Sequence, residues 1–440
     1  MNVLLITVDC LRHDRVGCIG GRADLTPNID RFSRGATVFT QAIAQGYNTE
    51  HSFPSIFTST YPRRRQVGLL NKPFTAGQPT LALLLKQQGY ASGGFHSNPW
   101  LSTHFGYGHE YDVYEDNLLP PAIRTRSNVA LRLSRALHVV TPYLAGDKIT
   151  AQALGWIKRQ SGPFFAWIHY MDAHGPYRIS RRLPGLVDHL LSWPLYRKAQ
   201  NRPQAITAAE HKKLVHTYEE GVRFVDQACG TLLGELESSA ILADTLVILT
   251  ADHGEAFGEH GRYTHGFEHP FDETVRVPLI VRWPGRQTVP RVEGQVELTT
   301  IVPTVLDVLG LPLPEQAVGR SAVSWLRGDA AGDQPINPEA ITSGGVSEQW
   351  TAVSVRTAEW KYILRRSGLD RILESSLYHL KGDPQELQEC GQQYPDVLAR
   401  LREHAEAHVR TILEGAAPEG DEQEMPEEVV ARLRSLGYLG

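Results

Sequence analysis

Asn2–Val8, near the start of the chain, is a continuous run rich in Val, Ile and Leu. Such a run is typical of a strand buried on both faces of a parallel sheet. Similar runs occur at Phe164–His169, Thr245–Thr250 and Val277–Arg282, with a small-residue strand candidate at Ala91–His96 and helical patterns at Thr80–Gln88, Ala151–Gln160 and Ala208–Leu236. Strands that alternate with helices predict an α/β fold, with a mostly parallel central sheet between helices.

The composition changes at Arg327–Gly345, a stretch rich in Gly, Asp and Pro that indicates a linker. We therefore expect a large domain over residues 1–335 and a small C-terminal α+β subdomain, packed on it, over residues 346–440. The smaller part has strand patterns at Trp350–Arg356, Trp360–Arg365 and Leu377–Leu380, and a helical pattern near Tyr394–Leu413. The acidic segment 415–428 contains proline and predicts a flexible loop.

Composition and charge exclude several classes of protein. The formal net charge of −5 argues against nucleic acid as a partner. The four cysteines show neither a disulfide framework nor zinc-finger spacing, which favours reduced thiols and the cytoplasm. No apolar run approaches the roughly eighteen residues of a membrane span, and the first residues lack the pattern of a signal peptide. We expect a soluble, cytoplasmic protein.

Polar residues that could carry chemistry follow three of the predicted strands. Asp9 ends the first strand, Asp252 and His253 follow another, and His174 follows a third in the sequence HGPY. In open α/β sheets, functional side chains lie just past the carboxyl ends of the strands. Two carboxylates and an imidazole in one place could bind a divalent metal. Alternatively, each aspartate caps a turn or bonds loop backbone.

The segment ADHGEAFGEHGRYTHG, residues 251–266, strengthens the interpretation as a metal site. Its glycines let a loop take positive φ and approach a ligand closely, and it places His253 and His265 at its two ends. We interpret His260 and His269 as solvated or structural. Of His169 and Asp172, near His174, strand alternation points one toward the core or a structural partner.

The stretch NTEHSFPSIFTSTYP, residues 48–62, begins like a capped helix and holds three candidate nucleophiles, Thr49, Ser52 and Ser55. By itself it does not select one of them.

Many segments resemble, in order, the sulfatases of the alkaline phosphatase superfamily. They are NVLLITVDCLRHDRVGC, TPNIDRFSRGATVFTQAIAQ, TLVILTADHGEAFGEHG, FDETVRVPLIVRWPG, LTTIVPTVLDVLGLPLPEQAVGRS, SVRTAEWKYIL, LYHLKGDPQEL and RLRSLGYLG. The resemblance covers nearly the whole chain. It implies a sulfatase-like catalytic domain over residues 1–335 and a metal-dependent ester hydrolase.

The resemblance also implies which hydroxyl is the nucleophile. Sulfatases carry a formylglycine made from Cys or Ser in a C/S-x-P-x-R motif, but Ile56 stands where the arginine would follow Ser52. The family spacing, counted back thirteen residues from Pro62, places Thr49 at the nucleophile and Ser52 beside it as a supporting residue. Phosphoethanolamine and lipoteichoic-acid type transferases are similar, because they use an unmodified threonine at a helix start and a metal loop like 252–266.

Departures from the sulfatase pattern bear on the metal. Cys10 replaces the second aspartate of the usual pair, His253 replaces the usual asparagine, and GYASGGFHSNPW lacks the lysine and histidine of the usual GKWH stretch. A site with Asp9, Thr49, Asp252 and His253 as ligands suits zinc or manganese better than calcium, which stays the alternative.

We expect Thr49 to attack an anionic phosphate- or sulfate-type ester that is linked to a glycan or a lipid, and we expect no nucleic-acid partner. His174 and His265 would bind its oxygens or protonate the leaving group, with Ser52 in support. The alternatives are a phospho-group transferase acting on a lipid or glycan, and an inactive sulfatase-fold binding protein. The segments 124–140 and Arg181–Pro203 predict either a lid for a lipid-like substrate or ordinary packed helices.

Overall fold

The computed structural model describes residues 1–62, 79–117, 143–177, 185–266, 269–286, 289–346, 350–368, 371–414 and 425–436. The predicted segment 124–140 and the basic residues Arg63–Arg65 lie outside these ranges.

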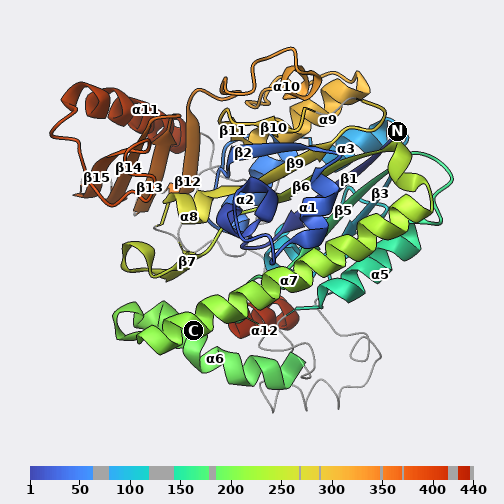
Figure 1. The fold of residues 1–440 in the computed structure, drawn as a ribbon, viewed down its shortest axis with the longest axis horizontal. Coiled ribbons are helices and arrows are strands. Elements are labelled where there is room, and N and C mark those ends of the chain that lie inside the picture. The colour runs from blue at the N-terminus through green and yellow to red at the C-terminus, as the bar shows by residue number, and fades with distance from the viewer. Residues whose placement is uncertain are drawn as a thin grey trace.

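The centre of the molecule is a large sheet with the strand order β10-β2-β9-β6-β1-β5-β3-β4, and β11 also pairs with β2 (Figure 1). The strands are β1 (Asn2–Val8), β2 (Thr37–Ile43), β3 (Ala91–Phe95), β4 (Val113–Glu115), β5 (Phe164–Tyr170), β6 (Thr245–Ala251), β9 (Arg276–Arg282), β10 (Arg291–Val292) and β11 (Val296–Glu297). The pairings are parallel except those of β9, which is antiparallel to β2 and β6. The predicted α/β fold with a mostly parallel sheet is confirmed.

Helices cover both faces of this sheet. Trp167 of β5 contacts Phe53 and Phe57 of one helix, whereas Tyr170, on the opposite face of the strand, shares a hydrogen bond with Thr150 of another. The helices are α1 (Pro27–Ser33), α2 (Thr49–Thr58), α3 (Leu81–Gln87), α5 (Gly146–Ile157), α6 (Gly185–Asn201), α7 (Ala208–Ser238), α8 (Asp272–Val275), α9 (Ile301–Leu309) and α10 (Val323–Arg327). On the Tyr170 side α5 packs against α7, and on the Trp167 side α2 packs against α3 and α9.

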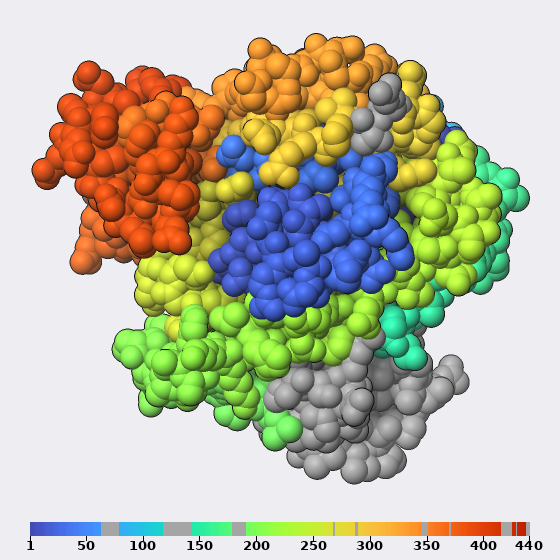
Figure 2. Space-filling model, in the orientation of Figure 1, coloured from blue at the N-terminus to red at the C-terminus, as the bar shows by residue number. Residues whose placement is uncertain are grey.

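A second, antiparallel sheet of β12 (Ala340–Val346), β13 (Trp350–Arg356), β14 (Trp360–Ser367) and β15 (Arg371–His379) carries α11 (Pro395–Glu414). Figure 2 shows this C-terminal lobe, in orange and red, beside the body of the molecule. Apolar side chains of α11 and the second sheet form a core of their own. These elements fit the predicted α+β subdomain.

The end of the chain packs differently from the expectation. Helix α12 (Glu427–Leu436) buries Val429 and Leu433 in the core of the large sheet, because these residues form an apolar face one turn apart. The segment 346–440 therefore does not pack as one unit, and the division at residues 335 and 346 stays a prediction. The expected loop 415–428 is helical at its last two residues, and residues 415–424 lie outside the described ranges.

Candidate active site

The polar side chains predicted to meet at one edge of the large sheet do so because three parallel strands end there together. Val8 of β1 pairs with Tyr170 of β5 on one side and with Ala251 of β6 on the other. Asp9 and Asp252, the next residues, are therefore neighbours, and both side chains are fully buried.

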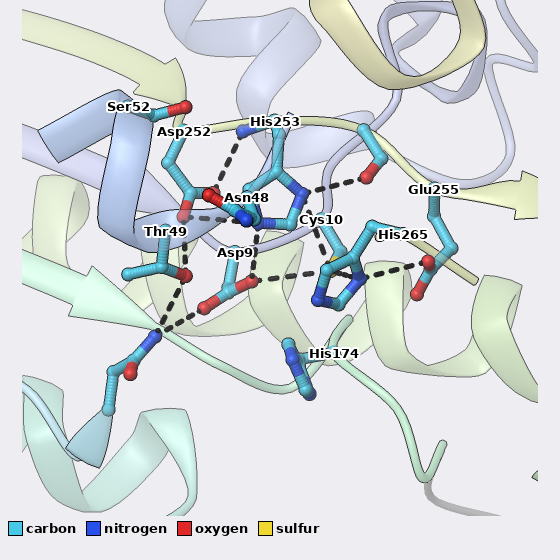
Figure 3. A network of polar contacts seen from close by, with 12 residues as sticks. Asp9, Cys10, Asn48, Thr49, Ser52, His174, Asp252, His253, Glu255 and His265 are labelled. Atoms are coloured by element: carbon cyan, nitrogen blue, oxygen red, sulfur yellow. Dashed lines mark hydrogen bonds and ion pairs between the residues drawn. The ribbon is translucent and has the colours of Figure 1, made fainter. Parts of the chain in front are cut away.

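Two carboxylates, an imidazole and a hydroxyl converge at this edge (Figure 3). His253 Nε2 lies 3.6 Å from Asp9 Oδ1 and 3.5 Å from Asp252 Oδ2. The Thr49 hydroxyl donates a hydrogen bond to Asp252 Oδ2 at 3.2 Å. The structure thus brings together all four of the predicted metal ligands.

Helix α2 presents Thr49 as its first residue. The side chain of Asn48 caps the helix by accepting a hydrogen bond from the His51 amide, and the buried aromatic face of α2 anchors it on β5. The positive end of the helix dipole makes this end favourable for an anion beside Thr49.

The other two candidate nucleophiles on this helix, Ser52 and Ser55, do not join the cluster. Ser52 donates a hydrogen bond to the carbonyl oxygen of Gly46 at 3.0 Å, and in Figure 3 its hydroxyl points away from Asp9. The Ser55 hydroxyl is buried and makes no hydrogen bond with the described residues. A direct substrate contact by Ser52 stays a prediction, and its hydrogen bond shows that it ties the start of α2 to the preceding loop.

Two further histidines, His265 and His174, lie side by side next to the carboxylates, and we call this pair the histidine wall. The ring of His265 lies 4.5 Å from that of His253 and 5.0 Å from that of His174, measured between centroids. The Glu255 carboxylate holds His265 through a 3.0 Å contact with Nδ1, and Tyr177 donates a hydrogen bond to the other oxygen of Glu255. The predicted residues His174 and His265 are thus placed beside the metal-ligand cluster.

These two histidines differ in their electrostatic surroundings. Burial lowers the pKa of His174 to about 4, so its imidazole is neutral at pH 7. Burial by itself also lowers the pKa of His265, but the carboxylates of Glu255, Asp9 and Asp252 together outweigh burial and raise this pKa above the ordinary value. The site therefore combines a neutral imidazole with one that favours the cationic form.

The donor set fits a divalent cation. His253 Nδ1 lies 2.9 Å from the carbonyl oxygen of Gly254, which assigns the proton to Nδ1. Nε2 is then a bare acceptor, and it is buried without a hydrogen-bond partner among the described residues. A lone pair that faces the carboxylates of Asp9 and Asp252 is unfavourable unless a cation lies between them. The two carboxylates and the imidazole thus offer oxygen and nitrogen donors of the kind that a divalent cation takes, and the choice of zinc or manganese stays a prediction.

The predicted metal-binding loop is built as a small hairpin of β7 (Ala256–Phe257) and β8 (Tyr263–Thr264). Gly258 and Gly261 take positive φ, as the glycine-rich sequence predicts. His260 stacks on Phe271 with 3.6 Å between ring centroids, and His269 Nε2 lies 2.6 Å from Glu273. These contacts with the segment around α8 agree with a structural role for both histidines.

Some residues at the site have no role assigned by sequence reasoning. The Asn98 side-chain amide donates a hydrogen bond to Asp9 Oδ2 at 2.7 Å. His169 Nε2 lies 3.2 Å from the same oxygen, whereas Asp172 accepts a hydrogen bond from the Gly146 amide at the start of α5. Alternation correctly separates His169 from Asp172 but does not show which one faces the site. An Asn-Pro pair after a weak strand, as at Asn98, resembles an ordinary turn.

No helix in the described ranges is long and apolar enough to cross a membrane. The cytoplasmic location stays a prediction. Of the two segments discussed as a lid, only α6 is described: Tyr196 packs edge-on against Tyr177, which follows the HGP turn.

Comparison with curated proteins gives partial matches to sulfatases. Arylsulfatase K of Mus musculus is 30% identical over 181 residues, which cover 40% of this chain and 32% of the relative, so the match spans about a third of that relative's length. N-acetylglucosamine-6-O-sulfatase of Bacteroides thetaiotaomicron is 22% identical over 476 residues and covers 88% of this chain and 82% of the relative.

Among solved structures, the phosphonate monoester hydrolase of Agrobacterium radiobacter has the same fold, with a TM-score of 0.69 at 20% identity over 93% of this chain and 95% of that chain. The family profile described as N-sulphoglucosamine sulphohydrolase, C-terminal, matches residues 258–410. The profile described as Sulfatase matches residues 1–311, well over half of the chain. The chain belongs to the sulfatase family.

Proposed function

We propose that this protein is a metal-dependent hydrolase of an anionic ester, with Thr49 as its nucleophile. The observation that carries the proposal is the convergence of the Thr49 hydroxyl, Asp9, Asp252 and the bare Nε2 of His253 at the N-terminus of α2. Of the four hydroxyls on that helix, only the Thr49 hydroxyl bonds to a member of the cluster.

Asp9, Asp252, His253 and Thr49 would hold the divalent cation. When bound, the cation supplies Lewis-acid charge that favours loss of the threonine proton and neutralises the ester. The N-terminus of α2 adds positive potential at the same place. Thr49 Oγ would attack the phosphorus or sulfur atom, and the bond to the leaving alcohol would break.

The two wall histidines suit different tasks in this reaction. His265, held by Glu255, presents positive charge to the non-bridging oxygens of the ester. Beside it, His174 is a neutral imidazole that can pass a proton to or from water or an alcohol. Water would then cleave the ester of Thr49 and restore the free hydroxyl.

Two kinds of ester are candidates, and each has its own support. A threonine ester of phosphate can be opened by water attack at phosphorus, whereas a formylglycine releases sulfate through its second hydroxyl, which threonine lacks. The chemistry therefore favours a phosphate mono- or diester. The sulfatase profile and the sulfatase names of the curated relatives support a sulfate ester, with a sulfated sugar as one form.

A panel of substrates tests the proposal. Protein stripped by a chelator is reloaded with zinc, manganese or calcium and assayed on aryl phosphate monoesters, phosphate diesters and sulfate esters. We expect zinc or manganese to restore turnover better than calcium, because His253 contributes a nitrogen ligand.

Thr49→Ala should reduce kcat by about a thousandfold or more, because the nucleophile is removed. Thr58→Ala is the matched control: Thr58 lies on the same helix, but its hydroxyl bonds the carbonyl oxygen of Pro54. Full turnover by Thr49→Ala would overturn the assignment of the nucleophile, and an absence of metal binding and of turnover in the unmutated protein would overturn the function.

A further inference from the structure

Asn98 occupies a fixed position at the edge of the candidate active site. It follows β3 and caps the short 3-10 helix Pro99–Leu101, because its Oδ1 accepts a hydrogen bond from the Trp100 amide at 2.9 Å. Its side chain is 1% exposed. The cap and the burial leave this residue little freedom to move.

The other end of the Asn98 amide reaches the nucleophile. Its Nδ2 donates a hydrogen bond of 2.7 Å to Asp9 Oδ2 and one of 3.3 Å to Thr49 Oγ1. The orientation of the amide follows from its partners. The opposite orientation would set the carbonyl oxygen against the Asp9 carboxylate and the NH2 group against the Trp100 N–H.

The Asn98 contact is important because it differs from the other hydrogen bond of the Thr49 hydroxyl. The threonine hydroxyl donates to Asp252 Oδ2 and accepts from Asn98 Nδ2. When the hydroxyl loses its proton, the bond to Asp252 loses its donor, whereas the bond from Asn98 remains and becomes charge-assisted. A fixed donor aimed at developing charge stabilises that charge without reorganisation.

We propose that Asn98 is a positioning residue, which orients the Thr49 hydroxyl through Oγ1 and the Asp9 carboxylate through Oδ2, and which stabilises the oxygen of Thr49 as it becomes the nucleophile. This inference rests on the proposed function. It extends that function to a residue outside the metal-ligand set and the histidine wall.

Two substitutions remove the hydrogen-bond donor of Asn98 but keep an oxygen that can cap the 3-10 helix. Asn98→Ser keeps a side-chain oxygen for the Trp100 amide but is too short to reach Thr49. Asn98→Asp keeps the shape and the cap acceptor but replaces the donor by a carboxylate. Gln152→Ala is the matched control, because it deletes a nearby side-chain amide that bonds Asn117 and not the site.

The variants are compared with the unmutated protein on the best ester of the panel, with metal content measured on the same samples. We expect Asn98→Ser to lower kcat by about a hundredfold, the cost of losing one preorganised donor, with little change in KM or in bound metal. Asn98→Asp should be at least as impaired, and Gln152→Ala should keep normal kcat.

Vanadate binding to the metal-loaded protein, measured by calorimetry, gives a readout that does not need turnover. We expect Asn98→Ser to weaken vanadate binding about tenfold or more, because vanadate accepts Thr49 Oγ as a fifth ligand. Unchanged kcat and vanadate affinity in Asn98→Ser would overturn the inference alone, and so would a loss of metal that matches the loss of kcat. An unmutated protein that binds neither metal nor vanadate and turns over no ester would overturn the proposed function, and this inference with it.

Discussion

At the scale of single residues, Gly254 sets the position of the predicted metal-binding loop. Its amide donates a hydrogen bond to the carbonyl oxygen of Thr274 at 2.7 Å, and the Glu255 amide donates one to the carbonyl oxygen of Glu273. A Cβ atom on Gly254 would lie 2.1 Å from the Glu273 oxygen. Only glycine allows this approach, which fixes His253 next to it.

Gly254→Ala should therefore displace the loop from α8 and weaken metal retention. We expect a loss of about 1–3 kcal/mol in the free energy of unfolding, as for other overpacked buried sites, and less bound metal after dialysis. Gly266→Ala is the control in the same segment, since a Cβ atom there would meet nothing within 4 Å. Normal metal retention in Gly254→Ala would contradict this account of the loop.

At the scale of elements, α11 carries a buried histidine. His408 is 8% exposed, and its ring centroid lies 5.1 Å from that of Tyr61, just beyond the end of α2. Its Nε2 makes no hydrogen bond with the described residues. Burial lowers the pKa of His408 to about 4.

This shift predicts a pH dependence of stability. Between pH 6.5 and 4 the unfolded chain binds more protons at His408 than the folded chain does. The free energy of unfolding is therefore unaffected by protonation of this residue above pH 6.5 and decreases as the pH falls below it. From pH 7.5 to 5.0 the loss from this residue should be about 2 kcal/mol. Urea unfolding of the unmutated protein and of His408→Leu at both pH values measures it. Equal losses in both proteins would contradict the prediction.

The same scale shows which elements the sequence predicts and which it does not. Runs of apolar residues locate β1, β5 and β6 within a residue or two, because a strand buried on both faces is apolar at nearly every position. The apolar run at β9 does not reveal its antiparallel direction, because strands of either direction can be buried on both faces. Helix α12 escapes prediction, since its acidic surroundings resemble a loop while two apolar side chains reach a distant core.

Some residues of the candidate site can also be predicted from the sequence, and others cannot. Asp9, Asp252 and His253 are predictable because they end buried strands, and Thr49 because the spacing of a known family points to it. Asn98 and His169 act through contacts between segments far apart in the chain, such as that between Asn98 and Asp9. Periodicity and local motifs carry no information on contacts of this kind.

At the scale of the whole molecule, buried charges connect the C-terminal lobe to the predicted metal-binding loop. Asp272, the first residue of α8, contacts Arg356 at 3.0 Å and Lys361 at 2.9 Å, both from the second sheet. Lys361 also contacts Glu386 at 2.8 Å, and its side chain is fully buried. Through α8, whose carbonyl groups hold Gly254 and Glu255, the lobe supports the loop that carries His253.

Lys361→Met should loosen this connection, because Asp272 and Glu386 then lose a buried counterion. Removal of one partner of a buried pair costs about 3–5 kcal/mol, and we expect both the free energy of unfolding and the affinity for metal to fall. Lys381→Met is the control, since Lys381 is 67% exposed and its pair with Glu359 is on the surface. A destabilised Lys361→Met that binds metal normally would show that the lobe does not support the loop.

The central place of β1 in the large sheet has a consequence for how the protein is made. This strand precedes both of its neighbours in the chain, and β5 and β6 are synthesised about 160 and 240 residues later. Until β5 has emerged this apolar strand has no partner on either edge, and until β6 has emerged one edge stays unpaired; such edges promote aggregation. We therefore expect contacts between incomplete chains, through the open edges of β1, to compete with folding when the protein is overproduced.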